Sequence, residues 1–271
     1  MKDGANYARR IKSFASRLSR LFKEPPPREP RPVIEELLYA ILARETSDER
    51  AARALEALYQ NTVDLNELRV TTPREIVRMM GEDLPEVAAK AEEIGAVLRD
   101  VVRRQGRLDL SSLKDRGLRE AREYLETLQG VSPFAAAWVF SRSLGGHAIA
   151  VDENMVRFLR AERLVPEKAE LADVQALLER NVSASISLRF QAALRQRALQ
   201  RQRSGGKGGR AGPRHSSSPS PSHRSAKAGT SRGSASGRAA RARSTNRQAS
   251  GKARSRTGSA ARASSSGRRR P

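Results

Sequence analysis

The 271-residue chain contains no cysteine and no long apolar run. Without cysteine it can hold no disulfide framework, no cysteine-ligated zinc, no catalytic thiol and no cysteine-held iron–sulfur cluster. No segment approaches the ~20 apolar residues that a membrane-spanning helix needs, and the N-terminus lacks the apolar core of a secretory signal. We therefore expect a soluble intracellular protein that needs no membrane, metal or cofactor.

Acidic residues are missing from the C-terminal end. Residues 201–271 hold 19 of the 52 Lys and Arg and none of the 30 Asp and Glu. The segment has no aromatic residue and few β-branched ones, so it cannot bury enough apolar area to offset its conformational entropy. We predict a disordered basic tail that condenses onto phosphate with little sequence preference. A solubilising appendage or an RNA-binding arm is the alternative, and we favour nucleic acid because solubility is more often achieved with mixed charge.

Residues 1–32 also carry excess positive charge, with nine basic and three acidic side chains. Within 1–24, apolar residues recur at helical spacing among the basic ones, which predicts a basic amphipathic helix. Such a helix either lies on an anionic membrane or docks its apolar stripe on the domain and turns its arginines toward DNA. We favour docking, because four modest apolar residues form a weak anchor. The proline-rich segment 25–32 predicts a stiff linker.

The middle of the chain, residues 33–200, is nearly neutral, with 24 basic and 27 acidic residues. Apolar residues recur there with the helical period, and no run alternates with period two. This pattern predicts a compact all-α body of about ten short helices. Ser47 fits a helix N-cap, and Thr72 followed by Pro73 and Glu75 is typical of a capping box.

Two expected helices meet at a tight turn over residues 128–133. The amides of Gly130, Val131 and Ser132 would converge at the start of the second helix, where they could bind a phosphate without any side-chain charge. The same residues also fit a plain helix–turn–helix corner, with Ser132 as cap and Pro133 at the first helical position. The residues alone favour neither interpretation.

This turn resembles the helix–hairpin–helix of the endonuclease III family of DNA glycosylases, whose hairpin reads Leu-Pro-Gly-Val-Gly. The resemblance continues into 147–158, where the family has an apolar run followed by Val-Asp-Thr-His. Upstream, residues 36–48 and the Lys-Ala-Glu-Glu-Ile of 90–94 match two further blocks of the family. These blocks occur in the family's order and together cover roughly residues 33–200.

The resemblance implies a two-lobed all-α fold, with a six-helix lobe over about 33–135 and a second lobe over about 136–200 that can include 1–24. Double-stranded DNA would lie in the cleft, with one nucleotide rotated out of the stack into a pocket. We expect a monomer that is cytoplasmic and associated with the nucleoid, or nuclear in a eukaryote.

The aspartate that matches Asp152 is essential in the family. Its charge stabilises the positive charge that builds on the sugar, or helps to activate the attacking water. Residue type alone favours Asp152 as the N-cap of a helix beginning at Glu153, and both roles can hold together because a cap fixes where the carboxylate points. The resemblance adds two DNA contacts: Glu45, which aligns with the Gln that fills the gap left by the flipped base, and Arg157 in the following helix.

The chain departs from the family at several of these positions. Bifunctional members have a lysine where this chain has Phe134, and a phenyl ring cannot form a Schiff base. Glu45 would bring a carboxylate into DNA, against phosphate repulsion and a desolvation cost. Ser132 replaces the second hairpin glycine, Pro133 has no N–H to donate, and Glu153-Asn154 replaces Thr-His.

These observations predict hydrolysis of the N-glycosidic bond of a damaged or mispaired base in duplex DNA, without lyase activity. The departures also support a second hypothesis, a catalytically inactive DNA-binding module of the same fold. A third hypothesis is a histone-like protein whose DNA binding is driven by the tail.

Overall fold

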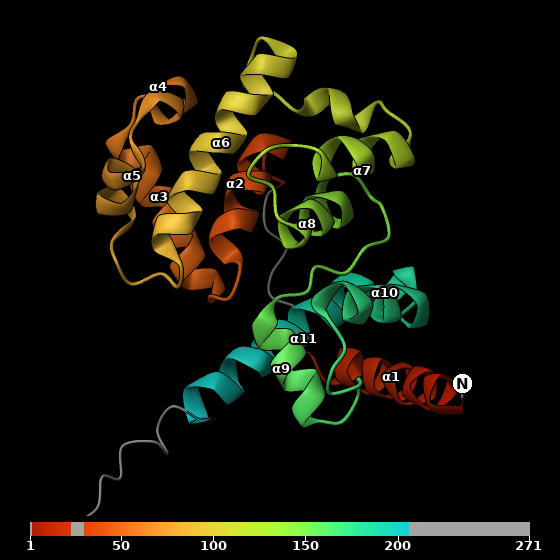
Figure 1. Ribbon diagram of the computed structural model, residues 1–271. Coiled ribbons are helices and arrows are strands. Elements are labelled where there is room, and N and C mark those ends of the chain that lie inside the picture. The colour runs from red at the N-terminus through yellow and green to blue at the C-terminus, as the bar shows by residue number, and fades with distance from the viewer. Residues whose placement is uncertain (1, 23–29, 206–271) are drawn as a thin grey trace, which may run out of the picture. The chain divides into compact units, whose positions relative to one another are not determined.

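The computed structural model describes residues 2–22 and 30–205; the segments 23–29 and 206–271 lie outside the described residues. Across the described part, the backbone forms eleven α-helices, one short 3-10 helix and no strand (Figure 1). The predicted all-α class is therefore confirmed. The elements are, in chain order, α1 (Lys2–Leu21), α2 (Val33–Ala43), α3 (Asp48–Asn61), α4 (Leu65–Val70), α5 (Pro73–Met80), α6 (Val87–Gln105), η1 (Ser111–Lys114), α7 (Leu118–Glu126), α8 (Pro133–Ser143), α9 (Glu153–Ala161), α10 (Leu171–Asn181) and α11 (Ala184–Gly205).

Local capping explains where several helices begin. Ser47 Oγ accepts the N–H of Arg50 at the start of α3, and Thr72 forms the expected capping box with Glu75 at the start of α5. Helix α4, capped by Asp64, was not predicted from the apolar period, because six residues make fewer than two turns. Helix α6 begins at Val87 because Glu86 adopts a left-handed conformation with φ +53°.

Two hydrophobic clusters divide the helices into two lobes. Helices α2 to α8 form the first lobe, and α1, α9, α10 and α11 form the second. We expected the boundary near residue 135, whereas residues 134–140 of α8 contribute to the first cluster, because the α8 aromatic side chains pack against α2. The chain passes from one lobe to the other in the segment 148–151, where Ala148 and Ala150 face the first cluster and Ile149 and Val151 the second.

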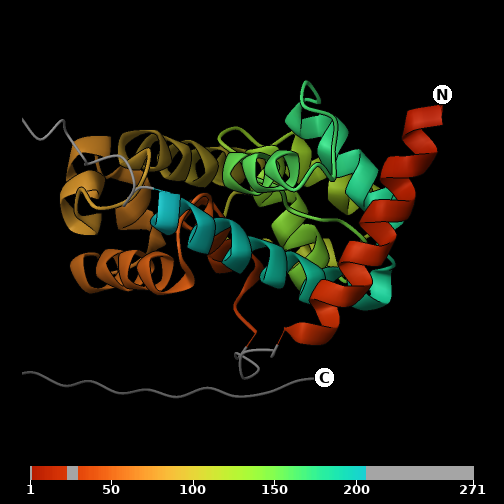
Figure 2. The ribbon, with the colours of Figure 1, turned by 90° about the horizontal axis from the view of Figure 1, so that it is seen from below.

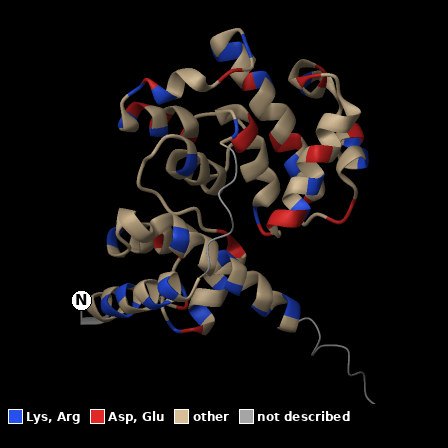
Figure 3. Cartoon of the chain, turned by 180° about the vertical axis from the view of Figure 1, so that it is seen from behind, with Lys and Arg blue, Asp and Glu red and all other residues tan. Residues whose placement is uncertain are grey.

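Helix α1 packs against α10 and α11 in the second lobe (Figure 2). Ile11, Ala15 and Leu18 are buried there, so the apolar stripe of this basic helix is used inside the protein. Lys and Arg positions recur along α1 and also along α11 (Figure 3). No helix in the described part of the chain is long and apolar enough to cross a membrane.

Helix α11 continues beyond the expected end of the domain. Residues 201–205 are helical rather than part of a disordered tail, and Arg201 forms an ion pair with Glu162, with 2.8 Å between Nη1 and Oε1. Arg, Gln and Ala are good helix formers, so the basic composition does not end the helix at residue 200. The rest of the predicted tail, 206–271, and most of the linker 25–32 lie outside the described residues.

Candidate active site

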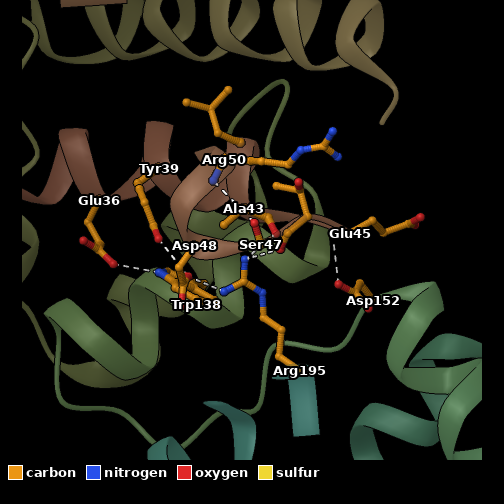
Figure 4. Close-up of polar contacts among 12 residues, drawn as sticks. Glu36, Tyr39, Ala43, Glu45, Ser47, Asp48, Arg50, Trp138, Asp152 and Arg195 are labelled. Atoms are coloured by element: carbon orange, nitrogen blue, oxygen red, sulfur yellow. Dashed lines mark hydrogen bonds and ion pairs between the residues drawn. The ribbon is translucent and has the colours of Figure 1, made fainter. Parts of the chain in front are cut away.

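Asp152 lies at the junction of the two lobes and is 2% exposed. Its Oδ1 accepts the N–H of Met155 at 2.9 Å, so the side chain caps α9. Its Oδ2 accepts the N–H of Glu45, which belongs to the turn between α2 and α3, at 3.0 Å (Figure 4). No ion pair joins Asp152 to any residue that the structure describes. Two backbone dipoles therefore fix and solvate the carboxylate, and no cation neutralises it.

Glu45 reaches Asp152 because of an unusual backbone conformation. Its φ is +57°, in the left-handed region that non-glycine residues seldom adopt, and this turns its N–H toward α9. The half-buried side chain lies 3.8 Å from Arg157, measured between Oε2 and Nη2. Burial raises the pKa of the Glu45 carboxyl above its usual value, and the negative charges of Asp152 and Glu86 raise it further.

Asn154 and Arg157 complete a small polar network beside Asp152. Asn154 Nδ2 donates to the carbonyl oxygen of Glu45 at 3.4 Å, and its Oδ1 accepts from Arg157 Nη2 at 2.6 Å. The Arg157 side chain is 60% exposed, so its guanidinium stands at the rim of this network. The two departures at Glu45 and Asn154 are thus brought together, with Arg157 between them.

A buried arginine from the second lobe holds the turn that carries Glu45. Arg195 on α11 donates from Nη2 to the carbonyl oxygens of Ala43 (2.9 Å) and Thr46 (2.6 Å), and its Nη1 forms an ion pair with Asp48 (Figure 4). Its guanidinium also lies over the Trp138 ring, 5.2 Å from the centroid. This side chain ties the α2–α3 turn of the first lobe to α11.

A buried lysine of the first lobe holds the same turn. Lys90 on α6 is 0% exposed, and its Nζ donates to the carbonyl oxygens of Leu42 (3.2 Å) and Arg44 (2.7 Å). Burial lowers the pKa of Lys90 to about 8, with a further contribution from the positive charge of Arg44. The last turn of α2 has no basic residue of its own, so Lys90 supplies the cation that its C-terminal carbonyls favour.

The hairpin at 128–132 packs tightly against α6. Gly130 has φ +80°, and a Cβ there would lie 2.6 Å from the carbonyl oxygen of Glu93, so only glycine fits. The N–H of Val131 donates to Leu128 O at 3.2 Å, and Ser132 Oγ accepts the N–H of Ala135 at 3.3 Å. We expected the amides of Gly130, Val131 and Ser132 all to be available for a phosphate. The N–H of Val131 is not, because it forms the hydrogen bond that closes the turn.

A groove of about 370 Å³ adjoins the hairpin, between α7, α8 and α10. Its polar lining side chains bond to one another: Arg122 pairs with Glu126 at 2.8 Å, and Gln175 donates to Glu179 at 2.9 Å. Asp152 does not line this groove. Within the described ranges, no group of three or more His, Asp or Glu side chains is arranged to hold a metal ion.

Solved structures share this arrangement of helices. A trapped endonuclease III–DNA covalent intermediate matches with a TM-score of 0.54 and 16% identity, over 69% of this chain and 84% of that one. The H. pylori 3-methyladenine DNA glycosylase bound to 1,N6-ethenoadenine matches with a TM-score of 0.54 and 17% identity, over 71% of this chain and 98% of that one. The fold is that of the helix–hairpin–helix DNA glycosylases.

A third glycosylase structure agrees. The Clostridium acetobutylicum 8-oxoguanine glycosylase/lyase in complex with DNA matches with a TM-score of 0.52 and 15% identity, over 71% of this chain and 70% of that one. No family profile matches the chain, and no curated protein matches it in sequence. The resemblance inferred from the motif blocks is confirmed at the level of the fold.

Phe134, which the sequence resemblance aligns with the lysine of the bifunctional glycosylases, is buried in the first lobe. Its ring centroid lies 5.6 Å from that of Trp138, whose Nε1 donates to Glu36 Oε1 at 2.7 Å. The side chain is 3% exposed, so this position serves the core and carries no amine.

Lys90 and Arg195 hold the site together, yet the sequence patterns assigned no role to either. The sequence does mark both residues, because each is a charged residue at a position that the helical period assigns to an apolar face. Lys90 precedes Ala91 and Ile94 on the buried side of α6, and Arg195 follows Leu194 on the buried side of α11. A lone cation on an apolar face of a glycosylase-like domain predicts a buried carbonyl or carboxylate partner.

Proposed function

We propose that this protein is a DNA N-glycosylase that removes a damaged or mispaired base from duplex DNA, as in base-excision repair. The observation that carries the proposal is the Asp152 carboxylate, which is buried at the junction of the lobes and fixed by two backbone N–H groups. Breaking a glycosidic bond builds positive charge on the sugar, and a fixed negative charge in a water-poor site stabilises that charge strongly.

The proposed reaction is hydrolysis. The bond between the sugar C1′ and the base nitrogen breaks, and the base leaves with the electron pair. A water oxygen then bonds to C1′, and the proton that the water loses passes to the Asp152 carboxylate or to the departing base. Phe134 offers no amine to attack C1′, so the proposed enzyme releases the base and leaves the DNA strand intact.

Cationic and amide groups in both lobes support DNA binding. The amides of Gly130 and Ser132 are the hairpin groups we assign to a backbone phosphate, and Arg157 offers an exposed guanidinium beside Asp152. On α1, four exposed cations form no ion pair with any described residue; these are Arg9, Lys12, Arg17 and Arg20. We assign them to sequence-independent attachment to phosphate.

One observation favours the alternative, a DNA-binding module without catalysis. Both oxygens of Asp152 already accept hydrogen bonds, and the Glu45 carboxyl lies near enough for the Asp152 charge to raise the pKa of Glu45. Because Asp152 is only 2% exposed, an extruded sugar reaches it only if the site opens, and a site that never opens would bind DNA without turnover.

The experiment uses the full chain and duplexes that carry a panel of lesions and mismatches, with half of each sample treated with alkali. We expect strand breaks only after alkali, and a roughly 100-fold or greater loss of rate in Asp152→Asn. Asp64→Asn is the matched control, because Asp64 caps α4 with the same chemistry away from the lobe junction. Binding without base release across the panel supports the silent module, and breaks without alkali contradict hydrolysis.

A further inference from the structure

The peptide group between Arg44 and Glu45 has a cation at one end and a carboxylate at the other. Its carbonyl oxygen accepts from Lys90 Nζ at 2.7 Å, and its N–H donates to Asp152 Oδ2 at 3.0 Å. Both atoms belong to one planar conjugated unit. Lys90 and Asp152 are therefore joined through a single peptide, although no direct contact between their side chains is present.

A fully buried lysine is costly unless it serves a purpose in the fold or the site. The Lys90 ammonium has no carboxylate within ion-pair distance among the residues that the structure describes, and its hydrogen bonds go to the Leu42 and Arg44 carbonyls. Neutral carbonyls compensate such a charge less fully than a carboxylate would. The arrangement thus concentrates positive charge on the peptide that faces Asp152.

We propose that Lys90 is a positioning residue for Asp152 and acts through the Arg44–Glu45 peptide. The ammonium polarises the carbonyl, and this strengthens the N–H donor at the other end of the peptide. The same contact holds the peptide plane so that the Glu45 N–H faces α9 despite its left-handed backbone. The catalytic consequence rests on the proposed glycosylase function, whereas the hydrogen-bond relay does not.

Other cations near the turn do not replace Lys90. The Arg44 guanidinium is engaged by Glu86 at 3.2 Å and Glu93 at 2.9 Å. Arg195 donates to Ala43 and Thr46 and gives no hydrogen bond to the Arg44 carbonyl. Among the described residues, Lys90 is the side-chain donor to this carbonyl.

The first test reads the relay without any reference to activity. In the full chain labelled with 15N, the Glu45 amide proton is followed by NMR in wild type, Lys90→Met and the control Lys168→Met, which removes the same charge from an exposed position. We expect an upfield shift and about tenfold faster amide exchange in Lys90→Met only. If Lys90→Met does not fold, Lys90→Gln keeps a donor and removes the charge. An unchanged Glu45 amide in the folded variant overturns the proposal.

The second test separates positioning from binding. We expect single-turnover base release to fall about tenfold in Lys90→Met, while affinity for the same duplex stays within about twofold. In an Asp152→Asn background, Lys90→Met should cause no further loss of rate, because the residue acts through that carboxylate. Equal losses in both backgrounds overturn the relay. If wild type releases no base, the proposed function fails. The NMR test of the Glu45 amide still decides whether Lys90 acts through the Arg44–Glu45 peptide.

Discussion

Replacing Glu45 with glutamine should strengthen DNA binding. The carboxyl lies at the rim of the site, 3.8 Å from Arg157, and its pKa is raised by burial and by the Asp152 and Glu86 charges. Glutamine keeps the size and the backbone N–H to Asp152 but removes a negative charge that opposes phosphate. It also removes the carboxylate that attracts the Arg157 guanidinium, which keeps its hydrogen bond to Asn154 but is 60% exposed and so can bind a phosphate.

The magnitude follows from the single phosphate that Arg157 would then bind. One such contact steepens the slope of log K against log salt by about 0.9 for duplex DNA. Removing one like charge several ångströms from a phosphate contributes on the order of 0.5–1 kcal/mol. Together these effects predict roughly three- to tenfold tighter binding at low salt, an advantage that shrinks as salt is added.

Fluorescence anisotropy across a salt series measures both the affinity and the slope. Glu92→Gln is the matched control, because Glu92 is an exposed glutamate on α6 whose loss changes the net charge equally. If the two variants show the same affinity and the same slope, the tighter binding is a general charge effect. Our placement of Glu45 and Arg157 at the DNA interface would then be wrong.

Three further predictions concern the hairpin, the tail and the buried lysine. Gly130→Ala should lower the free energy of unfolding by about 2–4 kcal/mol in urea titrations. Gly81 is the control, because it has a similar φ of +77° but open space around it, and Gly81→Ala should cost about 1–2 kcal/mol. Equal losses in the two variants would contradict the close approach of the hairpin to α6. In a chain ending at Gly205, the DNA affinity should depend less steeply on salt concentration, while the single-turnover rate of base release stays unchanged. Loss of all DNA affinity would instead favour the tail-driven hypothesis. Because burial, and after it the Arg44 charge, lowers the pKa of Lys90 to about 8 from an ordinary 10.5, against the Glu45, Glu86 and Glu93 charges that raise it, the unfolded chain holds this proton to higher pH than the folded protein does. As the pH rises from about 8 to 10.5, the free energy of unfolding of wild type should therefore rise relative to that of Lys90→Met. Over the same range the single-turnover rate of wild type should fall, because the Lys90 ammonium is lost. A rate that rises together with the stability would contradict the relay.

The parts of the fold that sequence could predict are those set by local spacing. Ser47 and Thr72 cap their helices as expected, because a cap depends on residues only three positions apart. Asp152 caps α9 for the same reason. The position of the boundary between the lobes depends on which cluster the aromatic face of α8 joins, and this is a long-range choice that local spacing does not determine.

The parts of the site that sequence could not predict are those made by distant segments. The left-handed conformation of Glu45 has no local signature, because an Asn or Gly would be the usual residue there. It is imposed by Lys90, Arg195 and Asp152, which lie 45 or more positions away along the chain. Each of these contacts is ordinary, but their convergence on one turn appears only when the chain is folded.

Two of the departures from the endonuclease III pattern, Glu45 and Asn154, contact each other, and this bears on whether the site is active. A site that had lost its function would be free to accumulate polar replacements without partners, and such orphaned groups are destabilising when buried. Here Asn154 bonds both to the Glu45 carbonyl and to Arg157, and Glu45 in turn faces Arg157. Neither residue leaves a buried polar atom without a partner. A site whose replacements satisfy one another around an intact Asp152 is better explained by a changed mode of opening the duplex than by decay, and this is why we favour the enzyme over the silent module.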